Sequence, residues 1–209
     1  MIEFFDIGWL AIKSESKEAV IQSLNLSEPF IQLDWNTGIS VVMGDIWDGV
    51  PFSRVYVSSP MRGWVLVVGD WISQTDKVAL CQRLSETYED VWAFSTQMRM
   101  DFWFYLYCKG GKIIRHFEKD GENIIDEGEL LKKEKTLRKE SLLDEEEDVN
   151  DPENWYGEDI VMGMAELFTI DPNELPEAML KKQLGTLAVT DVGREKGISE
   201  NPIEQWKES

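Results

Sequence analysis

Histidine and cysteine are scarce in this chain, and their scarcity excludes several common active sites. Only one histidine occurs, His116, so a metal site with two histidine ligands cannot form and a nucleophilic triad would depend on this residue alone. The two cysteines, Cys81 and Cys108, have neither metal-ligand spacing nor the arrangement of a disulfide framework. The glycine-rich, nucleophile-elbow and zinc-protease motifs of widespread enzyme families are also missing. We therefore expect reduced, buried thiols, and we expect neither a cofactor nor a metal ion.

Long apolar runs are missing too. No window approaches the length of about eighteen uncharged apolar residues that a membrane-spanning helix needs. The first residues, MIEFFDIGWLAIKSES, lack the basic region and apolar run of a signal peptide. Hydrophobic residues make up 43% of the 209 residues, so composition predicts a folded globular protein and not a disordered one. The sequence therefore predicts a cytoplasmic protein without a membrane span.

Positive charge is absent from one long stretch. Residues 140–180 contain fourteen Asp or Glu and no Lys or Arg, which accounts for about three quarters of the net charge of −19. Such a field repels nucleic-acid phosphates and anionic lipid surfaces. The charge therefore argues against nucleic-acid and membrane partners and favours a basic protein partner. The sequence leaves the oligomeric state open.

The first half of the chain alternates strand and helix patterns. The apolar residues 4–12 predict a strand, and SESKEAVIQSLNL predicts a helix that begins at a serine cap. Further strand signals occur in FIQLDW, ISVVM, RVYVSSP and GWVLVVGDW, where β-branched residues are bounded by Gly or Pro. The segment SQTDKVALCQRLSETYED predicts a second helix, with Ser73 and Asp76 in capping-box spacing.

From Val91 onward the pattern is an antiparallel meander. VWAFSTQ, MRMDFWFYLYC, KIIRHFE and IIDEG are typical of strands, separated by KGG and KDGEN turns. Alternate residues of the second segment, from Met98 to Cys108, share one strand face, so we expect a central strand with Phe104 in the core. We predict an α+β domain over residues 1–130, with a largely antiparallel sheet and two packed helices.

After Gly128 the pattern becomes helical. ELLKKEKTLRKESLL is a charged helix pattern, GEDIVMGMAELFTI places apolar residues on one helix face, and Asp171-Pro172 predicts the start of a short helix. A last helix is expected over residues 176–187. We predict that residues 131–190 form a charged and acidic helical extension docked on the sheet domain, followed by a polar tail over residues 191–209.

The acidic run SLLDEEEDVNDPENWYGED admits three interpretations. Carboxylates suit Ca²⁺, but the sixth position of an EF-hand loop should be glycine. It is Val149 in a loop that starts at Asp144 and Glu153 in one that starts at Asp148, so that spacing fails. The run could be a solvated linker. Alternatively, Trp155 and Tyr156 are large aromatics flanked by carboxylates, which is the composition of a binding hot spot with a charged rim. The predicted partner-binding residues are then Asp144, Glu145, Glu146, Glu147, Asp148, Asp151, Glu153, Trp155, Tyr156, Glu158 and Asp159.

A polar cluster on the meander suggests a different function. Arg99 and Asp101 lie two residues apart on the predicted strand, on the same face as Tyr105, and His116 is on the neighbouring strand. Such a cluster could serve a small-molecule enzyme as an acid–base centre. In a simpler interpretation, Arg99 and Asp101 pair beneath a covering helix, because an unpaired buried charge costs about 3–5 kcal/mol. His116 is then a partly exposed strand histidine without a catalytic role.

The succession GWVLVVGDW, VWAFSTQMRMDFWFYLY and GEDIVMGMAELFTIDPNEL resembles a group of uncharacterised bacterial proteins over residues 60–175. In size, acidity and α+β character the chain is also similar to immunity proteins of bacterial toxin systems. That similarity implies an inhibitor that covers the basic surface of a cognate toxin domain, and it carries no residue roles. We therefore expect an acidic, non-catalytic inhibitor, with a small-molecule enzyme or a non-inhibitory adaptor as the alternatives.

Overall fold

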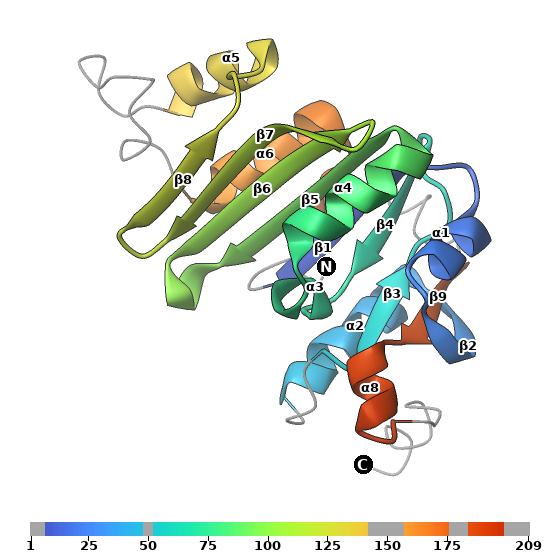
Figure 1. Cartoon of the computed structure of the whole chain (residues 1–209). Coiled ribbons are helices and arrows are strands. Elements are labelled where there is room, and N and C mark those ends of the chain that lie inside the picture. Colours follow the sequence, from blue (N-terminus) through green and yellow to red (C-terminus); the bar gives the residue numbers. More distant parts are fainter. Residues whose placement is uncertain (1–6, 48–51, 142–156, 176–183, 199–209) are drawn as a thin grey trace.

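The computed structural model describes residues 7–47, 52–141, 157–175 and 184–198. Within these ranges, nine strands join in one sheet and helices cover both of its faces (Figure 1). The strands are β1 (Ile7–Lys13), β2 (Ser27–Asp34), β3 (Arg54–Val57), β4 (Trp64–Val68), β5 (Asp90–Gln97), β6 (Phe102–Lys109), β7 (Lys112–Asp120), β8 (Asn123–Glu127) and β9 (Leu184–Val189). The helices are α1 (Lys17–Ser23), α2 (Trp35–Trp47), α3 (Trp71–Gln74), α4 (Lys77–Tyr88), α5 (Lys132–Ser141), α6 (Glu158–Phe168) and α8 (Asp191–Glu195), with 3-10 turns at η1 (Met98–Met100) and η3 (Pro172–Glu174).

The strand order is β2-β9-β3-β4-β1-β5-β6-β7-β8, and every pairing between these strands is antiparallel. The first strand, β1, lies in the middle, where Leu10 pairs with Val67 on one side and Ala93 on the other. Strands β5 to β8 follow one another as a meander. The predicted α+β class, the largely antiparallel sheet and the meander are therefore confirmed.

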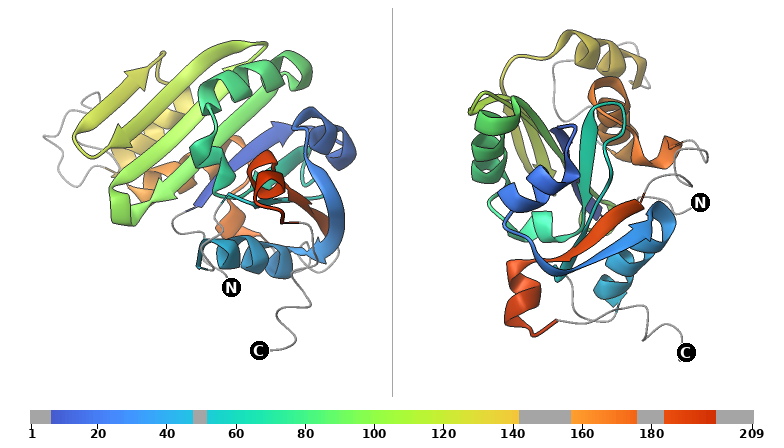
Figure 2. Two further views of the ribbon diagram at one scale, coloured as in Figure 1. Left: turned by 60° about the horizontal axis from the view of Figure 1, so that its bottom comes forward. Right: turned by 90° about the vertical axis from the view of Figure 1, so that its right-hand side faces the viewer.

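The sheet has two covered faces, as the right-hand view of Figure 2 shows. We call them the α4 face, covered by α1, α3 and α4, and the α6 face, covered by α2, α5 and α6. Successive β6 residues alternate between them, because side chains along a strand point to opposite faces. Phe104 and Leu106 are fully buried on the α4 face, and Tyr105 is fully buried on the α6 face. The central position of Phe104 is thus confirmed.

An aromatic stack holds α6 on its face of the sheet. The Trp92 ring on β5 stacks against Tyr107 on β6, with ring centroids 4.4 Å apart, and against Phe168 on α6 at 4.9 Å. Offset stacking adds to the burial of large apolar area. Ile160 and Met164, on the same side of α6, are also buried in this core.

Both predicted N-terminal helices occur, each with a side-chain cap. Ser16 Oγ accepts a hydrogen bond from Ala19 N at the start of α1, and Asp76 Oδ1 accepts one from Ala79 N at the start of α4, both at 3.1 Å. The predicted capping box is wrong, because Ser73 belongs to the preceding helix α3 and Asp76 alone is the cap of α4.

The strand prediction for ISVVM is wrong, since residues 39–43 lie in α2. The β-branched residues favoured a strand, but this preference is weak and tertiary packing overrides it. Trp35, Ile39 and Val42 are buried at helical spacing against the α6 face. The predicted strand at residues 98–100 is also a 3-10 turn, with Met98 and Met100 exposed.

The helix predicted over residues 176–187 is corrected at its end. Residues 184–187 belong to β9, which lies between β2 and β3, and residues 176–183 lie outside the described ranges. This part of the predicted extension is therefore part of the sheet. The reason is tertiary: Gly185 faces the Tyr56 ring so closely that a Cβ would lie 2.2 Å from Tyr56 Cζ. The predicted polar tail begins with the short helix α8, capped by Thr190.

Candidate functional site

Only Glu158 and Asp159 of the predicted partner-binding residues fall within the described ranges. The others lie outside them: Asp144, Glu145, Glu146, Glu147, Asp148, Asp151, Glu153, Trp155 and Tyr156. Glu158 and Asp159 form the first turn of α6, after Gly157, whose φ of 129° favours glycine. Carboxylates at this position interact favourably with the positive end of the helix dipole. Asp159 is exposed and Glu158 is half-buried.

The acidic segment, residues 142–156, is flanked by two helices that touch each other. Leu137 on α5 packs against α6 at Gly163, where a Cβ would lie 2.9 Å from Leu137 Cδ1. A larger residue than glycine would separate the helices. Both flanks of the segment are therefore fixed on the α6 face of the sheet.

A buried network of charges attaches α5 to the sheet. The carboxylate oxygen Glu134 Oε1 accepts hydrogen bonds from Arg115 Nε at 2.8 Å, Tyr105 Oη at 2.9 Å and Arg138 Nη2 at 3.1 Å. Arg115 also forms an ion pair with Asp126 on β8. Two guanidinium groups thus meet two carboxylates, so the charges balance. The side chains of Arg115, Glu134 and Arg138 have no exposed surface, whereas that of Asp126 is 22% exposed. Balanced, well-bonded charges are the condition under which burial is tolerated.

Burial changes the acid–base properties of this network. It raises the pKa of the Tyr105 hydroxyl well above its ordinary value, and it lowers the pKa of Arg138 to about 10. Both groups therefore keep their usual protonation at neutral pH, Tyr105 neutral and Arg138 charged. Neither Tyr105 nor Arg138 is therefore poised to exchange a proton near neutrality, which is typical of groups in a structural ion-pair network.

The sequence contained a signal for this network that periodicity analysis missed. Glu134 and Arg138 are four residues apart on α5, so they lie on one side of the helix and project together toward the sheet. Glu134 Oε2 also accepts a hydrogen bond from Leu131 N at 3.0 Å, which satisfies an N–H at the helix start. A charged pair on the apolar stripe of a helix is the pattern to look for.

The cluster proposed for a small-molecule enzyme does not assemble. Tyr105 is buried on the α6 face, whereas His116, opposite Leu106 on β7, is buried on the α4 face. Asp101 lies between η1 and β6 and pairs with Lys119 at 2.5 Å, and Arg99 is exposed in η1. The predicted Arg99–Asp101 pair beneath a helix is therefore also wrong, because Lys119 takes the place of Arg99. His116 is 6% exposed and so is more buried than we expected.

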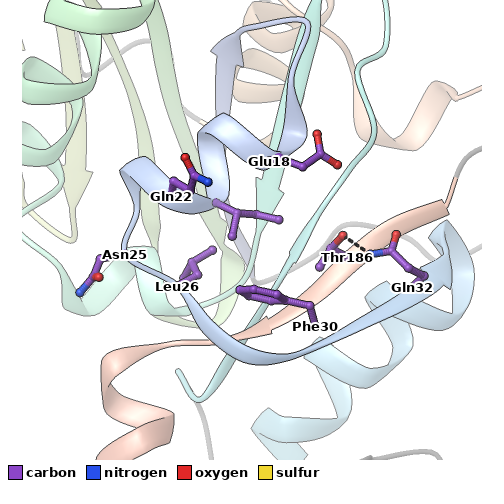
Figure 3. A pocket seen from close by; sticks show the side chains of 8 residues that line it. Glu18, Gln22, Asn25, Leu26, Phe30, Gln32 and Thr186 are labelled. Atoms are coloured by element: carbon purple, nitrogen blue, oxygen red, sulfur yellow. Dashed lines mark hydrogen bonds between the residues drawn. The ribbon is translucent and has the colours of Figure 1, made fainter.

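An open pocket of 480 Å³ lies on the α4 face, where α1 meets the β2–β9 edge of the sheet (Figure 3). Its apolar lining is formed by Ile21, Leu26 and Phe30, and the Phe30 side chain is 43% exposed. Glu18, Gln22 and Asn25 contribute polar groups from the α1 side. Gln32 on β2 and Thr186 on β9 form the strand side. Exposed aromatic surface beside polar groups is a usual composition of ligand pockets.

A hydrogen-bond chain fixes the strand side of this pocket. The Lys17 ammonium donates to Gln32 Oε1 at 2.9 Å and to the Leu184 carbonyl at 3.0 Å. Gln32 Nε2 in turn donates to Thr186 Oγ1 at 2.7 Å. Because an ammonium group can only donate, Gln32 must turn its oxygen toward Lys17 and its nitrogen toward Thr186. Lys17 is largely buried, and burial lowers its pKa.

Comparison with protein-family models finds no match for this chain, and comparisons with curated proteins and with solved structures find none either.

Within the described ranges, no group of three or more His, Cys, Asp or Glu side chains is arranged to hold a metal ion. None of the helices described is long and apolar enough to cross a membrane. Cys81 and Cys108 are free, buried thiols, as expected, and burial raises the pKa of both.

Proposed function

We propose that this chain is an acidic inhibitor that binds a basic protein partner. The complex would be of the kind that immunity proteins form with toxin domains. The partner-facing surface in this proposal is the acidic segment between α5 and α6, continued by Glu158 and Asp159. Support comes first from charge: the chain carries −19, and residues 140–180 hold no Lys or Arg. Such a field raises the encounter rate with a basic partner and repels acidic competitors.

The anchoring of both flanks is the observation that carries the proposal. On one side, Glu134 ties α5 to Arg115 in the sheet through a 2.8 Å ion pair without exposed surface. On the other side, α6 is held by the stack of Phe168 on Trp92. A segment held at both ends on a rigid scaffold loses less conformational entropy on binding than a free tail would. That arrangement suits a binding loop better than a spacer between mobile parts.

Charged and aromatic side chains have separate roles in this proposal. The carboxylates at the rim act through long-range attraction, which controls association. Trp155 and Tyr156 act through short-range burial, which controls dissociation. The two contributions can be measured separately because they change different rate constants.

Identification of the partner is the first step of the test. The chain and a Glu145→Lys, Glu146→Lys, Glu147→Lys variant are used in parallel as baits for proteins from the producing cell. A basic protein retained by the parent and not by the variant is then expressed alone. Its toxicity or enzymatic activity is measured with and without the chain. Inhibition supports the proposal, and tight binding without inhibition supports the adaptor alternative instead.

Stopped-flow binding then tests the surface. The triple Lys variant should associate more slowly by about one to two orders of magnitude at low salt, with little change in dissociation. Added salt should reduce this effect, because screening shortens to about 8 Å at physiological ionic strength. Trp155→Ala should instead speed dissociation and weaken binding by about 2 kcal/mol.

The matched control moves the same charge change away from the segment. Glu28 on β2, Glu86 on α4 and Glu195 on α8 are exposed in the described structure. Their combined change to Lys should slow association much less than the triple variant does. If the two triple variants behave alike, or if neither rate changes with Trp155→Ala, the segment is a linker and the binding surface lies elsewhere.

A further inference from the structure

The pocket between α1 and the β2–β9 edge is separate from the proposed partner surface. It lies on the α4 face, with Ile21 and Leu26 in that core, whereas α5 and α6 cover the opposite face. An inference about this pocket therefore does not depend on whether the chain inhibits a protein. Its volume of 480 Å³ is within the range of small-molecule sites, about 300–1,000 Å³.

The strand side of the pocket presents a hydrogen-bond donor. Gln32 turns its oxygen to the Lys17 ammonium at 2.9 Å, so the Gln32 nitrogen is the group left on the pocket side. This nitrogen carries two protons, and the bond to Thr186 Oγ1 uses one of them. The second proton is available for an acceptor atom on a ligand. The buried lysine behind Gln32 keeps the amide from flipping.

The α1 side presents an acceptor, and the lining between the two sides is apolar. Figure 3 shows Glu18 on the α1 side of the opening and Gln32 on the strand side, with Phe30 and Leu26 below. An ionised carboxylate can only accept hydrogen bonds. The partly exposed Phe30 ring offers a surface on which a planar group can stack.

Hydrogen-bond chemistry and charge together select for a neutral ligand. A donor-only cation has no acceptor atom for the Gln32 nitrogen, and the Gln32 oxygen already accepts from the Lys17 ammonium. An anion would be repelled by Glu18 and by the overall charge of −19. A matching ligand has a planar apolar body, one acceptor atom and one N–H donor.

We propose that this pocket binds an uncharged planar ring that carries an amide or lactam group. The ring stacks on Phe30, the carbonyl oxygen accepts a hydrogen bond from Gln32 Nε2, and the N–H donates to the Glu18 carboxylate. No covalent step is involved.

Three probes of equal shape test the proposal: benzamide, the benzamidinium cation and benzoate. Benzamide has both an acceptor and a donor, benzamidinium has donors only, and benzoate has acceptors only. Each is titrated into the ¹⁵N-labelled full chain at constant ionic strength. Benzamide should give saturable shifts at Ile21, Leu26 and Phe30, and it should bind about tenfold more tightly than either charged probe, because each of those lacks one hydrogen bond. Equal or tighter binding of a charged probe, or the absence of saturable shifts at these residues, overturns the proposal.

The Gln32→Glu variant gives the sharper test. It keeps the side-chain shape and an acceptor for Lys17, but it removes the donor on the pocket side. The affinity for benzamide should fall about tenfold and the affinity for benzamidinium should rise, so that the order of the two affinities reverses. Asn123→Asp adds the same charge in exposed β8 at the far edge of the sheet and should leave the order unchanged. An unchanged order in folded Gln32→Glu protein overturns the proposal.

A second variant covers the case in which Gln32→Glu does not fold, as judged by circular dichroism. Glu18 is exposed, so Glu18→Gln disturbs the fold little and replaces an acceptor-only group with one that can also donate. Benzoate should then bind more tightly than it does to the parent, and benzamide should lose its advantage over benzoate. If the ratio of the two affinities stays at the parent value, Glu18 does not accept a hydrogen bond from the ligand and the proposal is wrong.

Discussion

Arg115 on β7 and Glu134 on α5 form an ion pair of 2.8 Å in which neither side chain has any exposed surface. The two side chains can meet only when α5 lies in one position on the sheet. The ion pair therefore fixes the position of the helix that precedes the acidic segment. Buried ion pairs contribute little net stability, but the removal of one partner is costly. Removing one of the two side chains should therefore cost more stability than replacing both of them by apolar residues.

Glu134→Ala should lower the free energy of unfolding by about 3–5 kcal/mol, because it leaves two buried guanidinium groups without their shared carboxylate. Urea denaturation at neutral pH measures the change. Lys135→Ala, in the neighbouring exposed position on α5, should change stability by about 0.5 kcal/mol or less. Similar values for the two variants would show that the network does not hold α5.

Phe104→Ala should cost about 3–5 kcal/mol, because Phe104 is fully buried on the central strand β6 and its loss leaves a cavity. Thermal melting of the variant gives the result. Met100→Ala is the control, because Met100 is 67% exposed in η1. This variant should have a melting temperature close to that of the parent. A Phe104→Ala melting temperature within a degree or two of the parent would contradict the position of β6.

Gly38→Ala should destabilise the protein although alanine normally favours a helix. A Cβ at Gly38 would lie 2.1 Å from Tyr56 Cδ2. Tyr56 cannot retreat easily, because its hydroxyl donates to the Leu33 carbonyl at 3.1 Å and accepts from Gly185 N at 3.0 Å. Overpacking of this kind costs about 1–3 kcal/mol.

Gly8→Ala is the matched comparison for Gly38→Ala. The nearest atom to a Cβ at Gly8 would be 3.5 Å away, which is ordinary contact, so this variant should lose less stability in the same denaturation experiment. A Gly38→Ala variant more stable than the parent would mean that α2 does not press on Tyr56.

Glu118 should make stability depend on pH in the acid range. His116, with Nε2 3.8 Å from Glu118 Oε2, is the main cause that lowers the pKa of Glu118, and Lys77 at 3.3 Å acts in the same direction. A carboxyl group with a lowered folded pKa stabilises the protein above its unfolded pKa of about 4.3. That contribution is lost as the pH falls through the folded pKa.

Glu118→Gln should therefore be less stable than the parent near neutral pH, by on the order of 1 kcal/mol, and the difference should vanish as the pH falls from the unfolded pKa through the lowered folded pKa. Urea denaturation across this range measures it. His116→Ala serves as the control, because it should raise the pKa of Glu118 and move the acid loss of stability to higher pH. A difference between Glu118→Gln and the parent that is constant with pH would exclude this linkage.

The meander β5 to β8 could be predicted from sequence because its determinants are local. Alternation from Phe102 to Cys108 and the turns at residues 109–111 and 119–123 specify strand, register and reversal without help from distant residues. The segments that were predicted wrongly depend on distant contacts. Ile39 lies in a helix because the sheet offers a face for α2, and Leu187 lies in a strand because β2 and β3 flank it.

The candidate sites show the same division between what local sequence determines and what distant contacts decide. Sequence alone determined the charge of −19, the concentration of carboxylates in residues 140–180 and the chemistry that one histidine cannot support, because composition does not depend on folding. Tertiary structure alone decided that Tyr105 and His116 point to opposite faces, that Glu134 meets Arg115, and that Gln32 turns its amide nitrogen toward Thr186. Arg115 and Glu134 are 19 positions apart in the sequence, and Gln32 and its partner Thr186 are 154 apart. Only the packed sheet brings these residues together.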